Sequence, residues 1–91
     1  MKYIWVEKKN QLNIKKHGVA FDEAMTVLER AEYLSIVDDS SEEERRKAIG
    51  YSKKLRLLLV VYLYRDEDII RIISARKATK QEIKLWQKEK Y

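Results

Sequence analysis

The sequence LRLLLVVYLY, Leu55–Tyr64, lies near the middle of the chain and decides the fold class. Its core, Leu57 to Leu63, offers apolar side chains to both faces of an extended strand, which is typical of a strand covered on both sides. The run is far shorter than the ~20 residues of a membrane-spanning helix. We therefore expect a central strand of an antiparallel meander, with polar turns at Lys53-Lys54 and Arg65-Asp66-Glu67-Asp68 and neighbouring strands at Ala48–Ser52 and Ile69–Ala75.

The rest of the chain predicts one α+β domain over residues 1–91. A short alternating strand comes first, and two helical segments follow, of which the first stops at Gly18 and the second carries an apolar stripe. Thr79 and Glu82 form a capping box that begins a last helix. The expected elements are strand Lys2–Val6, helices Glu7–Lys16 and Phe21–Ala31, strand Tyr33–Val37, a loop over residues 38–44, the meander strands and the final helix. The alternative to the loop is a helix turn capped by Ser40 or Ser41, each followed three residues later by a glutamate. This order predicts a mostly antiparallel sheet of four to five strands, with two N-terminal helices and one C-terminal helix packed on it.

Composition excludes several classes of protein. A chain of 91 residues is long enough for one core and too short for a multidomain enzyme. It has no cysteine and one histidine, so disulfide frameworks, thiolate nucleophiles and cysteine-ligated zinc sites are excluded, and we expect no metal or other cofactor. The N-terminus lacks the apolar region of a signal peptide. We expect a soluble, cytoplasmic protein with no membrane association.

Charge is distributed unevenly along the chain. The formal net charge of +5 is made of +4 over residues 1–20, −8 over residues 21–44 and +9 over residues 45–91. If the two positive segments meet in the fold, they create the strong positive field expected for a polyanion partner. The alternative is that the lysines only solvate the surface.

The arginines of the last expected strand are candidates for phosphate binding. Arg71 interrupts the apolar run Ile69–Ile73, and Arg76 follows at the strand end. A guanidinium is always charged and binds phosphate oxygens with two prongs, so arginines mounted on a strand make a rigid phosphate site. The alternative for Arg71 is an ion pair with Asp38, Asp39 or Glu44. Arg65, in the expected turn, is a candidate of the same kind.

Three further groups have two interpretations each. His17 is either a general base or phosphate donor, or a surface residue that complements the helix dipole. Tyr62 and Tyr64 share a strand face and either stack on bases or belong to the core, with the core favoured for Tyr62. The basic run at residues 45–47 is most simply a solvated strand edge, although it extends a basic surface.

Several segments together resemble the BrnT family. They are Trp5, Asn13, Lys16-His17-Gly18-Val19, Phe21, Glu23-Ala24, Glu44-Arg45, Gly50, Val60-Val61-Tyr62, Arg65 and the RIISAR segment Arg71–Arg76 with Ala78. The KHG and RIISAR segments in this order and at this separation are the specific part of the resemblance, which covers about residues 3–83. The chain departs from the family pattern at Val6, Ala20, Arg46-Lys47, Leu63 and Tyr64. Ala20 replaces a helix-capping serine, and we expect Asp22 to take that role.

The resemblance implies a RelE-like α+β fold, RNA cleavage that inhibits translation, and neutralisation by a BrnA antitoxin that itself binds promoter DNA. We therefore expect a toxin that forms a hetero-oligomer with a BrnA-like antitoxin and contacts promoter DNA only through it. The positions that match the family's functional pattern are Lys16, His17, Arg45, Arg65, Arg71, Ser74 and Arg76.

The expected reaction is metal-independent attack of the RNA 2′-hydroxyl on the adjacent phosphate. His17, or a lysine such as Lys16, takes the proton in this scheme. The guanidinium groups stabilise the charge that develops on phosphorus. The expected catalytic residues are His17, Arg65, Arg71 and Arg76, and the expected substrate-binding residues are Lys16, Arg45, Ser74 and Tyr64. The alternative is a non-catalytic RNA-binding or protein-interaction domain that uses the same basic face.

Overall fold

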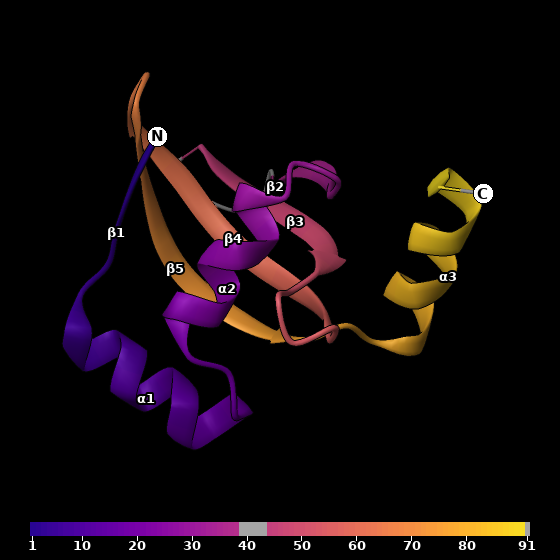
Figure 1. Cartoon of the computed structure of the whole chain (residues 1–91), viewed down its shortest axis with the longest axis horizontal. Helices are drawn as coiled ribbons and strands as arrows, with labels where there is room; N and C mark the ends of the chain where they lie inside the picture. Colours follow the sequence, from indigo (N-terminus) through magenta and orange to yellow (C-terminus); the bar gives the residue numbers. More distant parts are fainter. Residues whose placement is uncertain (39–43, 91) are drawn as a thin grey trace.

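The computed structural model describes residues 1–38 and 44–90 as one α+β domain (Figure 1). The expected loop over residues 38–44 lies mostly outside the described residues. The order of elements is as predicted: β1 (Lys2–Ile4), α1 (Glu7–His17), α2 (Phe21–Glu29), β2 (Leu34–Asp38), β3 (Arg45–Tyr51), β4 (Leu57–Asp66), β5 (Ile69–Lys77) and α3 (Lys80–Lys90).

The sheet has the strand order β1-β5-β4-β3-β2, so the apolar strand β4 is central, as predicted. Strands β2 to β5 pair antiparallel. β1 pairs with β5 in parallel, with Tyr3 beside Ile70, so the sheet is mixed and not purely antiparallel. A parallel pair needs a long connection, and here the chain passes through both N-terminal helices before it builds the rest of the sheet.

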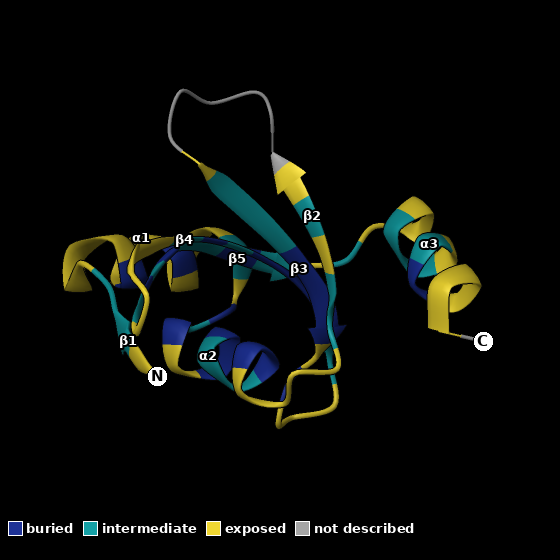
Figure 2. Cartoon of the chain, turned by 90° about the horizontal axis from the view of Figure 1, so that it is seen from above, coloured by how far each residue is buried: buried dark blue, intermediate teal, exposed yellow. Residues whose placement is uncertain are grey.

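The main core lies between α2 and one face of the sheet. Figure 2 shows the buried side of α2 turned toward the strands. Phe21 and Val27 of α2 are at most 1% exposed and pack in one cluster with Val60, Tyr62 and Ile72 of β4 and β5. Burying a side chain of this size stabilises the fold by roughly 1.5–3 kcal/mol. Tyr62 is therefore a core residue, as the sequence favoured.

The opposite face of the sheet is only partly covered. α3 places Trp86 against Ile49 and Leu59 in a second, smaller cluster. Further along β4, Leu63 lies on this face beside Arg71 and is half-buried, whereas Tyr64 lies on the α2 side with Tyr62 and is exposed. The prediction that Leu57 to Leu63 is covered on both sides is right for the α2 face and, on the opposite face, for its first half, whereas Val61 and Leu63 in its second half are only half-buried. This partly covered half of the opposite face, as far as the structure describes it, is called the open face below.

Two sequence assignments around the sheet were wrong. The basic run at residues 45–47 is not a strand edge, because β3 pairs with β2 on one side and β4 on the other, with Lys47 beside both Ile36 and Val61. Arg65 is not in a turn. It extends β4 as a bulge between the pairs Tyr64–Ile70 and Asp66–Ile69, which leaves Glu67-Asp68 as the turn. A bulge re-aims a side chain at the end of a strand.

The helix ends follow from local chemistry. Gly18 has a φ of +71° and its N–H donates to the Ile14 carbonyl, which ends α1. The predicted capping box of α3 is present, since Thr79 N–H donates to Glu82 Oε1 and Glu82 N–H donates to Thr79 Oγ1. At the start of α2, Asn10 of α1 accepts the Phe21 N–H at 2.8 Å, so this asparagine, and not Asp22, serves the end that Ala20 leaves uncapped. Among the described helices, none is long and apolar enough to cross a membrane.

Candidate functional site

Two arginines near the β4–β5 turn have guanidinium groups without a partner among the described residues. Arg71 lies on β5 beside Leu63 of β4, and its neighbours Ile70 and Ile72 point into the core, so Arg71 points to the open face. Within residues 1–38 and 44–90, neither Arg65 nor Arg71 forms a hydrogen bond or an ion pair. The side chain of Asp38 and the whole of Asp39, two of the alternative partners for Arg71, lie outside what the structure describes.

The first hollow beside these arginines, called the polar hollow below, has both charged and apolar side chains in its walls. It has a volume of about 390 Å³ and is lined by Glu44, Leu63, Tyr64, Arg65 and Arg71. Glu44 thus shares a hollow with Arg71 but makes no ion pair with it. A carboxylate and two unpaired guanidinium groups around one hollow can accept a proton and hold an anion at the same place.

The second hollow beside the same arginines has apolar walls. It has a volume of about 230 Å³ and is lined by Ile4, Trp5, Val6, Arg65 and Arg71. β1 brings these apolar residues to the arginines because Ile4 pairs with Arg71 in the parallel ladder. The sequence placed Trp5 on a strand face with Tyr3 but gave no sign that it lies next to the arginines. The β1–β5 pairing joins these distant segments.

Tyr64 and two arginines of β3, Arg45 and Arg46, lie at the same end of the sheet as Arg65 and Arg71. This end is called the basic end of the sheet below. The Arg46 guanidinium lies 5.7 Å from the centre of the Tyr64 ring, a cation–π distance. Arg45 lines a third hollow of about 340 Å³ together with Glu44 and Arg46. Four arginines therefore gather around the ends of β3, β4 and β5, namely Arg45, Arg46, Arg65 and Arg71.

The predicted residues Lys16 and His17 lie at the other end of β5. The α1 side chain Asn13 bonds to the backbone of Ala75, and the Gly18 carbonyl accepts from Arg56, the residue that precedes β4. This neighbourhood adjoins the last part of β5, since the Ala78 N–H donates to the Leu57 carbonyl. Ala75 is four residues after Arg71, about 13 Å along an extended strand. The structure therefore does not bring His17 together with Arg65 and Arg71.

Arg76 also lies away from the arginine pair. Its guanidinium binds Glu82 of α3 with two prongs, Nη1 to Oε1 at 2.8 Å and Nη2 to Oε2 at 2.9 Å. This bidentate contact holds the pKa of Glu82 below its usual value and raises that of Arg76. Ser74, another predicted site residue, lies between the two ends, half-buried and beside Val61. Of the predicted catalytic residues, only Arg65 and Arg71 share a site.

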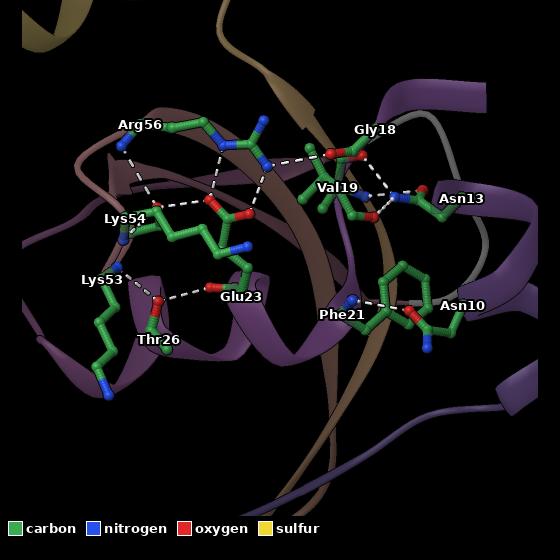
Figure 3. Close-up of polar contacts among 12 residues, drawn as sticks. Asn10, Asn13, Gly18, Val19, Phe21, Glu23, Thr26, Lys53, Lys54 and Arg56 are labelled. Carbon is green, nitrogen blue, oxygen red and sulfur yellow. Dashed lines mark hydrogen bonds and ion pairs between the residues drawn. The ribbon is translucent and has the colours of Figure 1, made fainter. Parts of the chain in front are cut away.

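A buried ion pair that was not predicted from the sequence joins three segments (Figure 3). Glu23 of α2, 5% exposed, forms a two-pronged ion pair with Arg56 and accepts from Ser52 Oγ at 2.7 Å. Arg56 Nη2 also donates to the Gly18 carbonyl at 3.1 Å. Hydrogen bonding from Arg56 lowers the pKa of Glu23. The available signal was Glu23 itself, four residues before Val27 and therefore on the buried stripe of α2.

The described side chains can also be compared with the ligand sets that hold metal ions. Across the part of the chain that the structure describes, no three His, Cys, Asp or Glu side chains gather in a way that could hold an ion. The charged groups that the described site offers are guanidinium groups and one carboxylate.

Comparison with known proteins gives the family. Residues 5–82 match the family described as the ribonuclease toxin BrnT of type II toxin-antitoxin systems. The chain belongs to the BrnT family. Members are ribonuclease toxins, so this BrnT protein has RNA as its target and an antitoxin as its partner. The match ends at Glu82, so most of α3 lies beyond it.

A solved structure supports the same assignment. The crystal structure of the Brucella abortus ribonuclease toxin BrnT superposes on this BrnT protein with a TM-score of 0.71 at 29% sequence identity. The superposition covers 88% of this chain and 99% of the Brucella chain. No curated protein matches the sequence.

Proposed function

We propose that this BrnT protein is a metal-independent endoribonuclease whose reaction centre is the open face around Arg65 and Arg71. The observation that carries the proposal is the pair of guanidinium groups that lie between two hollows and have no partner in the part of the chain that the structure describes. Each guanidinium group can bind phosphate oxygens with two N–H groups, and members of this family act on RNA, so the anion that we place here is an RNA phosphate. We place the reaction in the cytoplasm, where RNA is available, and assign the cleavage of RNA as the cause of translation inhibition.

The reaction begins with the 2′-hydroxyl next to the phosphate that is cleaved. Its proton is removed, its oxygen forms a bond to phosphorus, and the bond from phosphorus to the 5′-oxygen breaks. The 5′-oxygen takes up a proton. The products are a 2′,3′-cyclic phosphate and a 5′-hydroxyl. Arg65 and Arg71 stabilise the negative charge on the phosphate oxygens in the transition state, which is the largest contribution in reactions of this kind.

Glu44 is the group that we assign to take the 2′-hydroxyl proton. It lines the polar hollow together with both arginines, whereas His17 and Lys16 lie at the other end of β5. A general base must come within hydrogen-bond reach of the proton that it removes. Arg45 and Tyr64, at the rim of the same end of the sheet, bind neighbouring parts of the substrate.

The antitoxin of this pair is, in our proposal, a BrnA-like protein that forms a hetero-oligomer with the toxin. It neutralises the toxin by covering the basic end of the sheet, so that RNA no longer reaches the arginine pair. Promoter DNA is bound through the antitoxin's own domain.

The test is cleavage of a defined RNA by the purified protein, with and without EDTA, followed by analysis of the product ends. We expect cleavage that EDTA does not change and 2′,3′-cyclic phosphate ends. Arg71→Ala and Arg65→Ala should each lower the rate at least 100-fold if one guanidinium contributes as much as one oxyanion-hole donor. The matched control is Lys88→Ala, which removes one exposed positive charge from α3. If the RNA is retarded in a gel but remains intact, the protein is an RNA-binding domain and not a ribonuclease.

A further inference from the structure

The two hollows on either side of the arginine pair differ in chemistry. The polar hollow carries Glu44 and Tyr64, and the apolar hollow carries Ile4, Trp5 and Val6. A phosphate held by Arg65 and Arg71 therefore has a polar neighbour on one side and an apolar neighbour on the other. In an RNA chain each phosphate also has two neighbours, a nucleoside on its 5′ side and one on its 3′ side.

Trp5 is held in place before any ligand arrives. Its ring packs edge-to-face on Phe21 with a centroid distance of 6.2 Å and an interplanar angle of 84°. The indole Nε1–H donates to Glu7 Oε1 at 3.4 Å. A half-buried indole with two fixed neighbours loses little conformational freedom on binding, which favours its use as a stacking surface.

The rest of the apolar hollow fits a base and not a charged group. Val6 is 42% exposed and Ile4 is half-buried, and neither side chain has a hydrogen-bonding atom. Stacking without hydrogen bonds to the base edge tolerates every base, because every base has a π face. The hollow therefore supports binding with little sequence preference.

We propose that the hollow lined by Ile4, Trp5 and Val6 is a nucleobase subsite for the nucleotide on the 3′ side of the cleaved bond. The assignment to the 3′ side, as opposed to the 5′ side, rests on the proposed function. The 2′-hydroxyl that attacks belongs to the 5′ nucleotide and must lie next to Glu44, in the polar hollow. The phosphate lies on the arginines, so the 3′ nucleoside continues to the Trp5 side.

The test uses DNA oligonucleotides that contain a single ribonucleotide, because they are cleaved only at that position by 2′-hydroxyl attack. An abasic residue is placed on the 3′ side or on the 5′ side of the ribonucleotide. For the wild-type protein we expect the 3′ abasic substrate to lose about 10- to 100-fold in kcat/KM, the range for one stacked base. The 5′ abasic substrate should lose much less.

The matching variants are Trp5→Leu and Trp5→Phe, with Leu12→Ala as a control at an exposed apolar residue outside the hollow. Trp5→Leu should lower kcat/KM on the intact substrate by the same factor of about 10 to 100. For this variant, the 3′ abasic substrate and the intact substrate should have the same kcat/KM. Trp5→Phe keeps an aromatic ring against Phe21 and should retain most of the rate. Equal sensitivity of wild type and Trp5→Leu to the 3′ abasic site overturns the subsite, as does greater loss with the 5′ abasic site.

A binding measurement separates this inference from the proposed function. Fluorescence anisotropy with all-DNA oligonucleotides, which lack the 2′-hydroxyl, reports affinity without cleavage. If the wild type cleaves no RNA but Trp5→Leu weakens base-dependent binding, the ribonuclease mechanism and the 3′ assignment fail, and the nucleobase site at Trp5 stands. If the wild type cleaves RNA but Trp5→Leu leaves both the rate and the affinity unchanged, the subsite fails and the function stands. A wild type that neither cleaves RNA nor binds any oligonucleotide overturns both.

Discussion

Arg76 and Glu82 form a two-pronged ion pair that joins the end of β5 to the first turn of α3. The same carboxylate accepts the Thr79 N–H at 2.8 Å, so one side chain serves both as the helix cap and as the partner of the arginine. A guanidinium that is bound in this way has fewer N–H groups left for a phosphate. We therefore infer that Arg76 serves the attachment of α3 rather than the reaction.

Replacing Arg76 should weaken the fold more than the chemistry. Since the Arg76 side chain is 36% exposed, we expect Arg76→Ala to lower the free energy of unfolding by about 1 kcal/mol, the upper range for a partly exposed pair. Urea unfolding of Arg76→Ala, Glu82→Ala and the double variant should show that the two losses are not additive. If the Arg76→Ala protein is folded and has normal stability but does not cleave RNA, Arg76 takes part in the reaction.

Glu23 should have a larger effect on stability because it is buried. Glu23→Gln removes the charge that Arg56 faces, and breaking a buried pair in this way costs about 3 kcal/mol. Arg56 lowers the pKa of Glu23 below its ordinary value of 4.5. The stabilisation is therefore present above about pH 4.5 and is lost as the pH falls through the lower, folded-state pKa. Urea unfolding between pH 7 and pH 3 should show a shallower acid loss in Glu23→Gln than in the wild type, and equal slopes would contradict this.

Asn13 should be required for the attachment of α1 to β5. Its amide donates to the carbonyls of Val19 at 2.7 Å and Ala75 at 2.9 Å, and it accepts the Ala75 N–H. Asn13→Ala leaves these buried backbone groups without partners, and we expect a loss of about 3 kcal/mol. The control is Gln11→Ala, an exposed residue of the same helix. Thermal unfolding followed by circular dichroism measures both, and a loss no larger than that of the control would show that water replaces the amide.

His17 should not set the pH dependence of cleavage. Because it lies at the far end of β5 from Arg71, His17→Gln should keep both the rate and the shape of the pH–rate profile between pH 5 and pH 8. Glu44→Gln is the contrasting variant and should lower the rate about 100-fold, a typical contribution of a general base. Loss of cleavage in a folded His17→Gln protein, with Glu44→Gln unaffected, would reverse the two assignments.

The fold was largely predictable because its signals are local. The apolar run of β4, the positive φ that Gly18 permits and the capping box at Thr79 each depend on residues close in sequence. The parallel pairing of β1 was not predictable in this way, since its partner strand begins at Ile69 and no short turn fixes its direction. The loss of cover over the second half of β4 depends on where α3 packs.

The site was predictable by residue type and not by location. Arg71 and Arg76 occur in one segment and look equivalent in the sequence, but an acid six residues after Arg76 binds it while Arg71 stays free among the described residues. Glu82 was recognised only as a capping residue. Trp5 and Glu44 come from parts of the chain distant from β5, so their place beside the arginines follows only from the strand order.

The parallel pairing of β1 with β5 also has a consequence for the time at which the toxin becomes active. The site combines residues 4–6 with residues 65–71, and contacts between segments so distant in sequence form late in folding. A chain that is still being synthesised holds Trp5 without its arginines until β5 has been made. The complete site can therefore form only after the chain has been synthesised through Arg71.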